Sequence, residues 1–130
     1  MRMFSKLALA LALSGAALAA PASAHLTLVS ASPAANASAS AATTKLIVLK
    51  FSDTLTPQQS GAALIMTGMP GMANHPYMKI PGVTASIGAD GKSLELSLAK
   101  PLPVGTYRID WYVVGSDTHR VTGQHSFSIG

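Results

Sequence analysis

Residues 105–130, GTYRIDWYVVGSDTHRVTGQHSFSIG, decide the fold class that we expect for this chain. In the first ten of these residues, large apolar side chains alternate with more polar ones, which is the pattern of a strand with one buried face. The apolar face carries Tyr107, Ile109, Trp111 and Val113. After a polar segment, residues 125–129 form a shorter predicted strand with Phe127 and Ile129 facing inward. The end of the chain is therefore predicted to be β-structure.

Further short strands are predicted upstream, and turn residues separate them. They cover residues 26–30, 45–51, 61–66, 83–87 and 93–98. The pair Thr56-Pro57 and the run GADG at 88–91 are typical turn signals. Seven short strands without a convincing helix predict an all-β domain, an antiparallel β-sandwich or barrel of immunoglobulin-like size. The Ala/Ser-rich residues 31–44 predict a mobile connection.

The first 24 residues have the pattern of a secretory signal peptide. Arg2 and Lys6 form a basic start, residues 7–20 are apolar, and Ala22-Ser23-Ala24 matches a cleavage site. The alternative is an uncleaved anchor, but the apolar run is short for a membrane span. We expect cleavage after Ala24, export, and one soluble domain at residues 25–130 that is large enough to bury a core.

The charge and the cysteine content exclude several classes of function. The formal net charge is +4, but the lysines and arginines of residues 25–130 are scattered, so nothing favours binding of nucleic acid or of an anionic membrane. The chain has no Cys, which excludes zinc fingers, iron–sulfur clusters, blue-copper centres and thiol nucleophiles, because each needs a thiolate. A metal site must therefore use His, Met, carboxylates or the chain terminus.

A methionine-rich segment, MTGMPGMANHPYM at residues 66–78, indicates a site for reduced copper. It holds all the methionines of residues 25–130 together with one histidine: Met66, Met69, Met72, His75 and Met78. Its Gly and Pro residues argue against a helix that buries the methionines in a core. Thioether sulfur is a soft, uncharged ligand that suits Cu(I) and needs no deprotonation.

A second candidate site starts at His25, which becomes the first residue if cleavage follows Ala24. Its α-amine and imidazole Nδ1 could then chelate one ion as a histidine brace, and such nitrogen donors favour Cu(II); the alternative is a frayed chain end. Asp117 and His119, two residues apart, can converge on one ion, although a solvated turn Asp beside an exposed His is commoner. Asp53 is a further candidate ligand, with a turn or cap role as its alternative.

Other polar residues have simpler structural explanations. His125 shares the parity of Phe127 and Ile129, which favours a structural or rim position over metal binding. Arg108 and Asp110 alternate outward from the long strand and are expected to be solvated. Catalysis is poorly supported, because the sequence has no nucleophile elbow or glycine-rich phosphate loop and few carboxylates that could form a catalytic pair.

Four stretches of the chain resemble the CopC family of periplasmic copper-resistance proteins. They are HLTLVSASPA (25–34), LKFSDTL (49–55), LIMTGMPGMANHPYM (64–78) and GTYRIDWYVVGSDTHRVTGQHSFSI (105–129). The resemblance implies a seven-stranded Greek-key β-barrel, similar in shape to a cupredoxin, with two copper sites near opposite ends. It implies Cu(II) ligation by His25, Asp117 and His119. It implies Cu(I) ligation by a subset of Met66, Met69, Met72, His75 and Met78.

Three details depart from the family pattern. Leu26 follows His25 where many relatives have Pro. Asp53 stands where Glu is frequent, so its reach toward Cu(II) is one methylene shorter. The segment from Met72 to His75 is one residue longer than in close relatives, so His75 is expected to approach copper differently.

We therefore predict a periplasmic copper carrier for copper homeostasis and resistance, and not an enzyme. The resemblance implies a CopD-type inner-membrane transporter and a multicopper oxidase as partners; we expect a monomer, with a copper-bridged dimer as the alternative. Two other hypotheses stay open: a histidine-brace oxidoreductase that cleaves polysaccharides, and an immunoglobulin-like interaction module. The first is disfavoured because Asp117 would fill a coordination position, and the second because the methionines cluster with a histidine.

Overall fold

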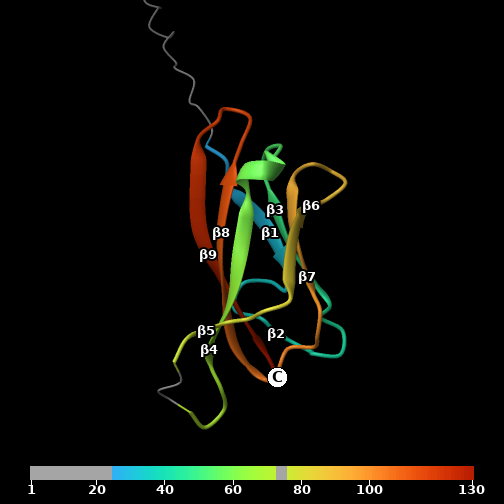
Figure 1. Ribbon diagram of the computed structural model, residues 1–130, viewed down its shortest axis with the longest axis vertical. Helices are drawn as coiled ribbons and strands as arrows, with labels where there is room; N and C mark the ends of the chain where they lie inside the picture. The colour runs from blue at the N-terminus through green and yellow to red at the C-terminus, as the bar shows by residue number, and fades with distance from the viewer. Residues whose placement is uncertain (1–24, 73–75) are drawn as a thin grey trace, which may run out of the picture.

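The computed structural model describes residues 25–72 and 76–130 and arranges them as two β-sheets that face each other (Figure 1). The first sheet has the order β1 (Leu28–Ser32), β3 (Leu46–Phe51), β7 (Ser93–Leu98) and β6 (Val83–Ile87). The second has the order β2 (Ser38–Ala39), β9 (Arg120–Ile129), β8 (Gly105–Val114), β4 (Gly61–Gly68) and β5 (Met78–Lys79). A 3-10 turn, η2 (Pro57–Gln59), precedes β4.

The predicted all-β fold is confirmed. In the described part of the chain β2 and β5 have only two residues each, and the remaining seven strands correspond to the seven that the sequence predicts. The chain passes from one sheet to the other after β1, β2, β3, β5 and β7, so β3 pairs with β7 while β4 pairs with β8. Antiparallel strands exchanged between two sheets in this way form a Greek-key sandwich.

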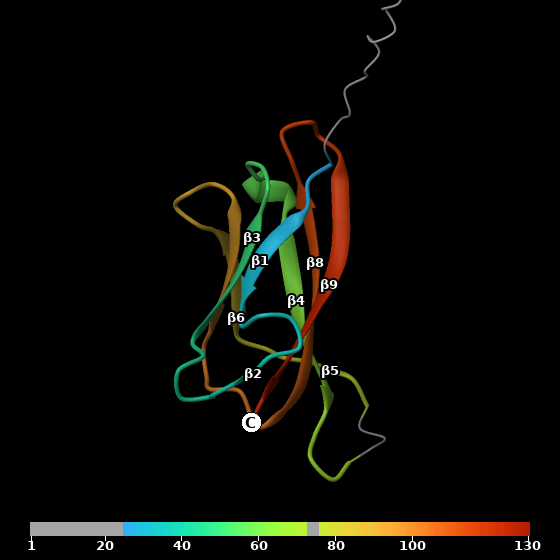
Figure 2. The same cartoon turned by 180° about the vertical axis from the view of Figure 1, so that it is seen from behind.

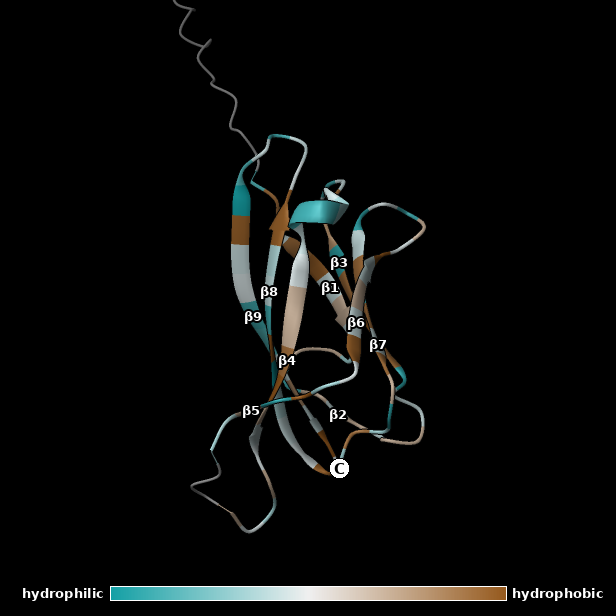
Figure 3. Ribbon diagram, viewed as in Figure 1, coloured by the Kyte–Doolittle hydropathy of each residue, from teal (hydrophilic) through white to brown (hydrophobic). Residues whose placement is uncertain are grey.

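The core lies between the sheets and uses the apolar faces that the sequence predicts. Hydrophobic and hydrophilic residues alternate along the strands (Figure 3). Phe51 meets Trp111 edge-on with ring centroids 4.9 Å apart, and Tyr107 stacks on Phe127 at 5.6 Å. Trp111 can lie over β9 because Gly123 stands directly opposite it, where a Cβ would come 2.3 Å from Cζ2 of the indole. Burial of each such large side chain contributes about 1.5–3 kcal/mol to folding.

The turn between β6 and β7 forms where the run GADG predicts it. Gly91 has φ +73°, a left-handed conformation that favours glycine. Asp90 accepts the backbone N–H of Lys92 at 2.9 Å on Oδ1 and the hydroxyl of Ser93 at 2.9 Å on Oδ2. These bonds, the backbone one first, hold the pKa of Asp90 below its usual range because they stabilise the ionised carboxylate.

Residues 31–44 are not the mobile connection that their composition predicts. The amide of Asn36 donates to the carbonyl of Ser126 at 2.7 Å, and the amide of Ser128 donates to the carbonyl of Ala37 at 2.9 Å. β2 then continues beside β9 as a parallel strand. The prediction was wrong because the composition of a segment does not reveal backbone partners that lie far along the chain, here in β9.

β9 is longer than predicted, beginning at Arg120 rather than at His125. Its first half was missed because Gly123 and polar residues interrupt the apolar alternation, yet it pairs with β8 throughout. His125 is only 5% exposed, and its Nε2 lies 2.8 Å from the carbonyl oxygen of Pro33. This contact agrees with the predicted structural role of His125.

The two candidate sites lie at opposite ends of the sandwich. The beginning of β1 and the β8–β9 turn lie at one end, and the connection from β4 to β5 projects from the other, as views from both sides show (Figures 1 and 2). No helix within residues 25–72 or 76–130 is long and apolar enough to cross a membrane. The predicted signal peptide at residues 1–24 and the candidate ligand His75 lie outside the described residues.

Candidate metal sites

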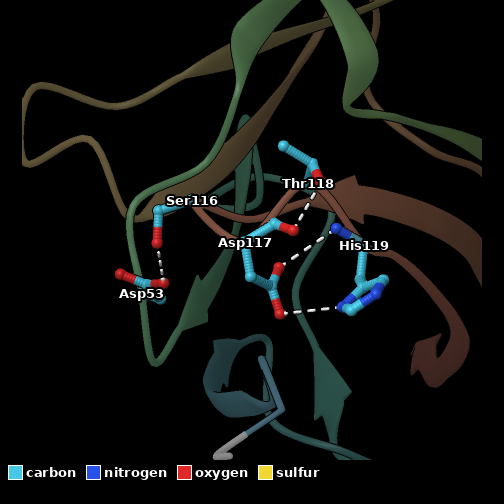
Figure 4. A network of polar contacts seen from close by, with 5 residues as sticks. All are labelled: Asp53, Ser116, Asp117, Thr118 and His119. Carbon is cyan, nitrogen blue, oxygen red and sulfur yellow. Dashed lines mark hydrogen bonds and ion pairs between the residues drawn. The ribbon is translucent and has the colours of Figure 1, made fainter.

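The turn between β8 and β9 brings Asp117 and His119 into contact (Figure 4). The backbone N–H of His119 donates to Oδ1 of Asp117 at 3.1 Å, and Nδ1 of His119 lies 3.2 Å from Oδ2. Thr118 between them has φ +68°, and its amide donates to the carbonyl of Gly115 at 3.0 Å. The two side chains therefore converge through a tight turn, rather than through the extended backbone that we expected, and Nε2 of the ring remains for a metal.

Asp53 joins this end from the loop after β3. Its Oδ2 accepts the hydroxyl of Ser116 at 2.7 Å, and its Oδ1 accepts the amide of Thr54 at 2.7 Å. A Cβ added to Gly115 would lie 3.5 Å from Oδ1 of Asp117 and 3.7 Å from Oδ2 of Asp53. Both carboxylates thus border the same small space, which the absence of a side chain at Gly115 leaves open.

Hydrogen bonds lower the pKa of both carboxyl groups. The backbone amide of His119, followed by its side chain, holds the pKa of Asp117 below its usual range. The hydroxyl of Ser116, followed by the amide of Thr54, does the same for the pKa of Asp53. A carboxylate that binds a cation must be deprotonated, so both groups are in the required state at neutral pH.

His25 lies at the same end of the sandwich, but it is not grouped with Asp53, Asp117 and His119 in the structure. It is exposed, whereas its neighbour Leu26 is buried and approaches Gly115, with Cδ2 3.6 Å from the position of an added Cβ. Within residues 25–72 and 76–130, no group of three or more His, Cys, Asp or Glu could hold a metal ion. In the full chain the nitrogen of His25 is a peptide amide, because Ala24 precedes it. The structure therefore brings together Asp117 and His119, with Asp53 beside them.

A turn at the opposite end brings Met69 and Met72 side by side. The amide of Met72 donates to the carbonyl of Met69 at 3.1 Å, and the two residues form an isolated antiparallel bridge. Pro70 presets φ at the first central position and Gly71, with φ +77°, takes the second, as in a type II turn. The sequence Met-Pro-Gly-Met thus places two thioethers at the two ends of one turn.

The other two methionines lie opposite each other on β4 and β5. Met66 pairs with Met78 in the antiparallel register. Met66 is only 3% exposed and belongs to the core, whereas Met69, Met72 and Met78 are 38%, 50% and 49% exposed. A groove of about 270 Å³ beside Met69 includes Val104 in its lining. Three thioethers are therefore accessible to an ion, and ligation by Met66 would disturb core packing.

Sequence reasoning missed two contacts near these sites. Ser116 hydrogen bonds to Asp53 across 63 positions of sequence. Arg108, expected to be solvated, donates from Nε and Nη2 to Asp110 at 2.7 and 3.1 Å, and its guanidinium lies 5.3 Å from the ring centroid of Tyr77. Strand alternation indicated that Arg108 faces outward, but it could not indicate these partners.

Comparison with known proteins decides the family. The CopC domain model matches residues 28–130. The chain belongs to the CopC family. This CopC protein is 48% identical to Copper resistance protein C of Escherichia coli over 88 residues, which cover 68% of this chain and 69% of that protein. It is 52% identical to Copper resistance protein C of Xanthomonas campestris pv. juglandis over 83 residues, which cover 64% of each chain.

Solved structures agree with this assignment. The crystal structure of selenomethionine PcoC, a copper resistance protein from Escherichia coli, superposes with a TM-score of 0.74 at 43% identity, covering 80% of this chain and 99% of PcoC. CopC from Methylosinus trichosporium OB3b gives a TM-score of 0.63 at 28% identity, covering 81% and 93% of the two chains. The predicted family and Greek-key fold are confirmed, and copper binding and copper resistance belong to this family. The relatives are named for copper resistance and not for a catalysed reaction.

Proposed function

We propose that this CopC protein is a periplasmic carrier that holds Cu(II) and Cu(I) at opposite ends of one β-sandwich. The main support is the separation of donor types. Imidazole and carboxylate donors gather at the β8–β9 turn, whereas thioethers gather at the β4–β5 connection. These two segments lie at opposite ends of the sandwich (Figure 1). Borderline and hard donors favour Cu(II) and soft donors favour Cu(I), so each oxidation state has its own preferred end.

The Cu(II) ligands in this proposal are the imidazoles of His25 and His119, the carboxylate of Asp117 and the terminal amine of His25. Cleavage after Ala24 would convert the amide nitrogen of His25 into that amine, which binds metal after losing a proton. Support comes from the short reach involved, because Leu26 already approaches Gly115 in the β8–β9 loop. Asp53 is an adjacent carboxylate that a bound ion could recruit.

The Cu(I) ligands in this proposal come from the methionine segment. Met69 and Met72 flank one turn, and Met78 begins β5 nearby; their exposure makes them the primary thioethers. Met66 and His75 complete the set from which a subset binds at any time. Thioethers stay available as pH falls, since they carry no proton to displace.

Transfer follows from this difference in ligand softness. Reduction of bound copper weakens its binding to the imidazoles and carboxylate and favours the methionines, and oxidation does the reverse. The protein would thus accept and release copper in either state without catalysing a reaction. Its partners in this proposal are a CopD-type inner-membrane transporter and a multicopper oxidase, with the carrier acting as a monomer.

Electron paramagnetic resonance tests the proposal on protein that begins at His25. We expect one equivalent of Cu(II) to give a type-2 signal with nitrogen couplings. The matched control carries one extra residue before His25; its signal should be disturbed, and it should bind Cu(II) more weakly. A second variant, Met69→Leu with Met72→Leu, should lose Cu(I) affinity in an anaerobic competition with a chromophoric chelator, while its Cu(II) signal stays unchanged.

Three results would contradict the proposal. An unchanged Cu(II) signal in the extended protein would exclude the terminal amine and leave His119 to be tested with other donors. Equal loss of Cu(I) and Cu(II) binding in either variant would mean that the two ends do not act as separate sites. Absence of any specific copper binding would favour the plain interaction module.

A further inference from the structure

We infer that Arg108 is a positioning residue for the methionine end, because it clamps Tyr77 and thereby holds the start of β5 against the second sheet. Tyr77 directly precedes Met78, the first residue of β5. The inference rests on the proposed Cu(I) function of this end. It adds a contact that positions the thioether of Met78 before copper binds.

The guanidinium of Arg108 is fixed in place by its own strand. Asp110, the next outward-facing residue of β8, accepts hydrogen bonds from Nε and Nη2 at 2.7 and 3.1 Å. This two-point contact sets the plane of the guanidinium as well as its position. The cationic carbon then lies 5.3 Å from the ring centroid of Tyr77, within the range of a cation–π interaction.

The clamp spans three strands. Arg108 stands opposite Ile65 of β4 in the register, and Ile65 stands opposite Lys79 of β5. Tyr77 precedes Lys79 by two positions, so the side chain of Arg108 passes across β4 to reach it. The contact therefore ties the end of the methionine segment to β8, the long central strand of the sheet.

β5 has few other attachments in the described chain. Its ladder consists of two residue pairs, Lys79 with Ile65 and Met78 with Met66, and the amide of Ile80 donates to the carbonyl of Leu64 at 2.8 Å. So short a strand is marginal by itself, because each ordered residue loses conformational entropy. A contact at Tyr77 holds the chain just before Met78, where the ladder ends.

The consequence for binding is preorganisation. A thioether that is already held in place pays less ordering entropy when an ion binds. An exposed cation–π contact contributes about 0.5–1 kcal/mol, which corresponds to a two- to fivefold change in affinity. We therefore expect loss of the contact to weaken Cu(I) binding about two- to fivefold and to leave Cu(II) binding at the other end unchanged.

Chelator competition for Cu(I) tests this with single and double variants. Tyr77→Ala and Arg108→Gln should each weaken binding about two- to fivefold, and the double variant should lose little more than the larger single loss, because both changes remove one contact. Tyr77→Phe keeps the aromatic face and should restore wild-type affinity. Tyr112→Ala is the matched control, since Tyr112 of β8 makes the same kind of contact with Arg120 of β9, at 4.6 Å, away from β5; it should leave Cu(I) affinity unchanged.

The outcomes separate the clamp from the proposed function. Wild-type affinity in Tyr77→Ala, or additive losses in the double variant, would overturn the clamp. If the wild-type protein bound no Cu(I), the proposed function would fail, and the clamp would be decided on the metal-free proteins by NMR of methionine methyl groups. There the Met78 methyl signal should move in both Tyr77→Ala and Arg108→Gln and stay in place in Tyr112→Ala; an unmoved signal would overturn the inference.

Discussion

Gly71→Ala should weaken Cu(I) binding through the backbone alone. Gly71 occupies the second central position of the turn that holds Met69 and Met72, with φ +77°. Among the residues that the structure describes, a Cβ added there meets nothing within 4 Å, so the substitution introduces no clash with them. The remaining cost is that of placing an L-residue in the left-handed region, about 1–2 kcal/mol.

This cost converts directly into an expected loss of affinity. If copper binds the turn as the structure has it, a penalty of about 1–2 kcal/mol lowers the population of the competent turn about five- to thirtyfold. Apparent Cu(I) affinity should fall by the same factor in an anaerobic competition with a chromophoric chelator. Gly71→Asn should lose less, because Asn tolerates the left-handed region better than Ala.

A second glycine supplies the control for this experiment. Gly91 has φ +73° in the β6–β7 turn, and a Cβ there would make only an ordinary contact, 3.8 Å from Cγ2 of Thr54. Gly91→Ala should therefore cost similar backbone strain while leaving Cu(I) affinity unchanged. Affinity within about twofold of wild type in Gly71→Ala would refute the reasoning, because it would show that Cu(I) does not require this turn.

Three further changes test other parts of the structure. Gly123→Ala forces a Cβ to 2.3 Å from the indole of Trp111 and should lower the free energy of unfolding by about 1–3 kcal/mol, visible in thermal denaturation; an unchanged melting temperature would contradict the close packing. Asp90 has a lowered pKa, so its carboxylate stabilises the fold above its ordinary value of 3.8 and loses this contribution as pH falls through the folded value. Asp90→Ala should therefore be less stable than wild type at neutral pH, and urea unfolding should show the difference vanish on acidification; a difference independent of pH would contradict this. Ser116→Ala removes the hydrogen bond to Asp53 and should weaken Cu(II) binding without affecting Cu(I) binding; equal Cu(II) affinity in a competition titration would show that this bond does not organise the site.

The sequence predicted those parts of the fold in which residues close together along the chain show the pattern of a strand and of its buried face. The apolar alternation of β8 places Tyr107 and Trp111 in the core, where they are found. The first half of β9 lacked such alternation, because position 123 is a glycine. Its lack of a side chain leaves room for Trp111 on the neighbouring strand. That reason becomes visible only when the two strands are paired. Residues 31–44 were misjudged for a related reason, since their backbone partners lie in β9.

The candidate sites likewise contain some contacts between residues close in sequence and others between residues far apart in sequence. Met69 and Met72 come together through Pro70 and Gly71 between them, and Asp117 meets His119 through the intervening turn. The sequence named these residues as candidates, but it singled out no pair of methionines and predicted extended backbone, not a turn, between Asp117 and His119. Other contacts around both pairs come from distant parts of the chain, as when Ser116 meets Asp53 or when Arg108 reaches Tyr77. Those meetings depend on which strands become neighbours and on which way side chains lean across them, and neither follows from spacing along one strand. The proposed brace needs one step more, because the amine of His25 comes into being only when the bond to Ala24 is cut; chemistry after synthesis, and not folding, would complete that site.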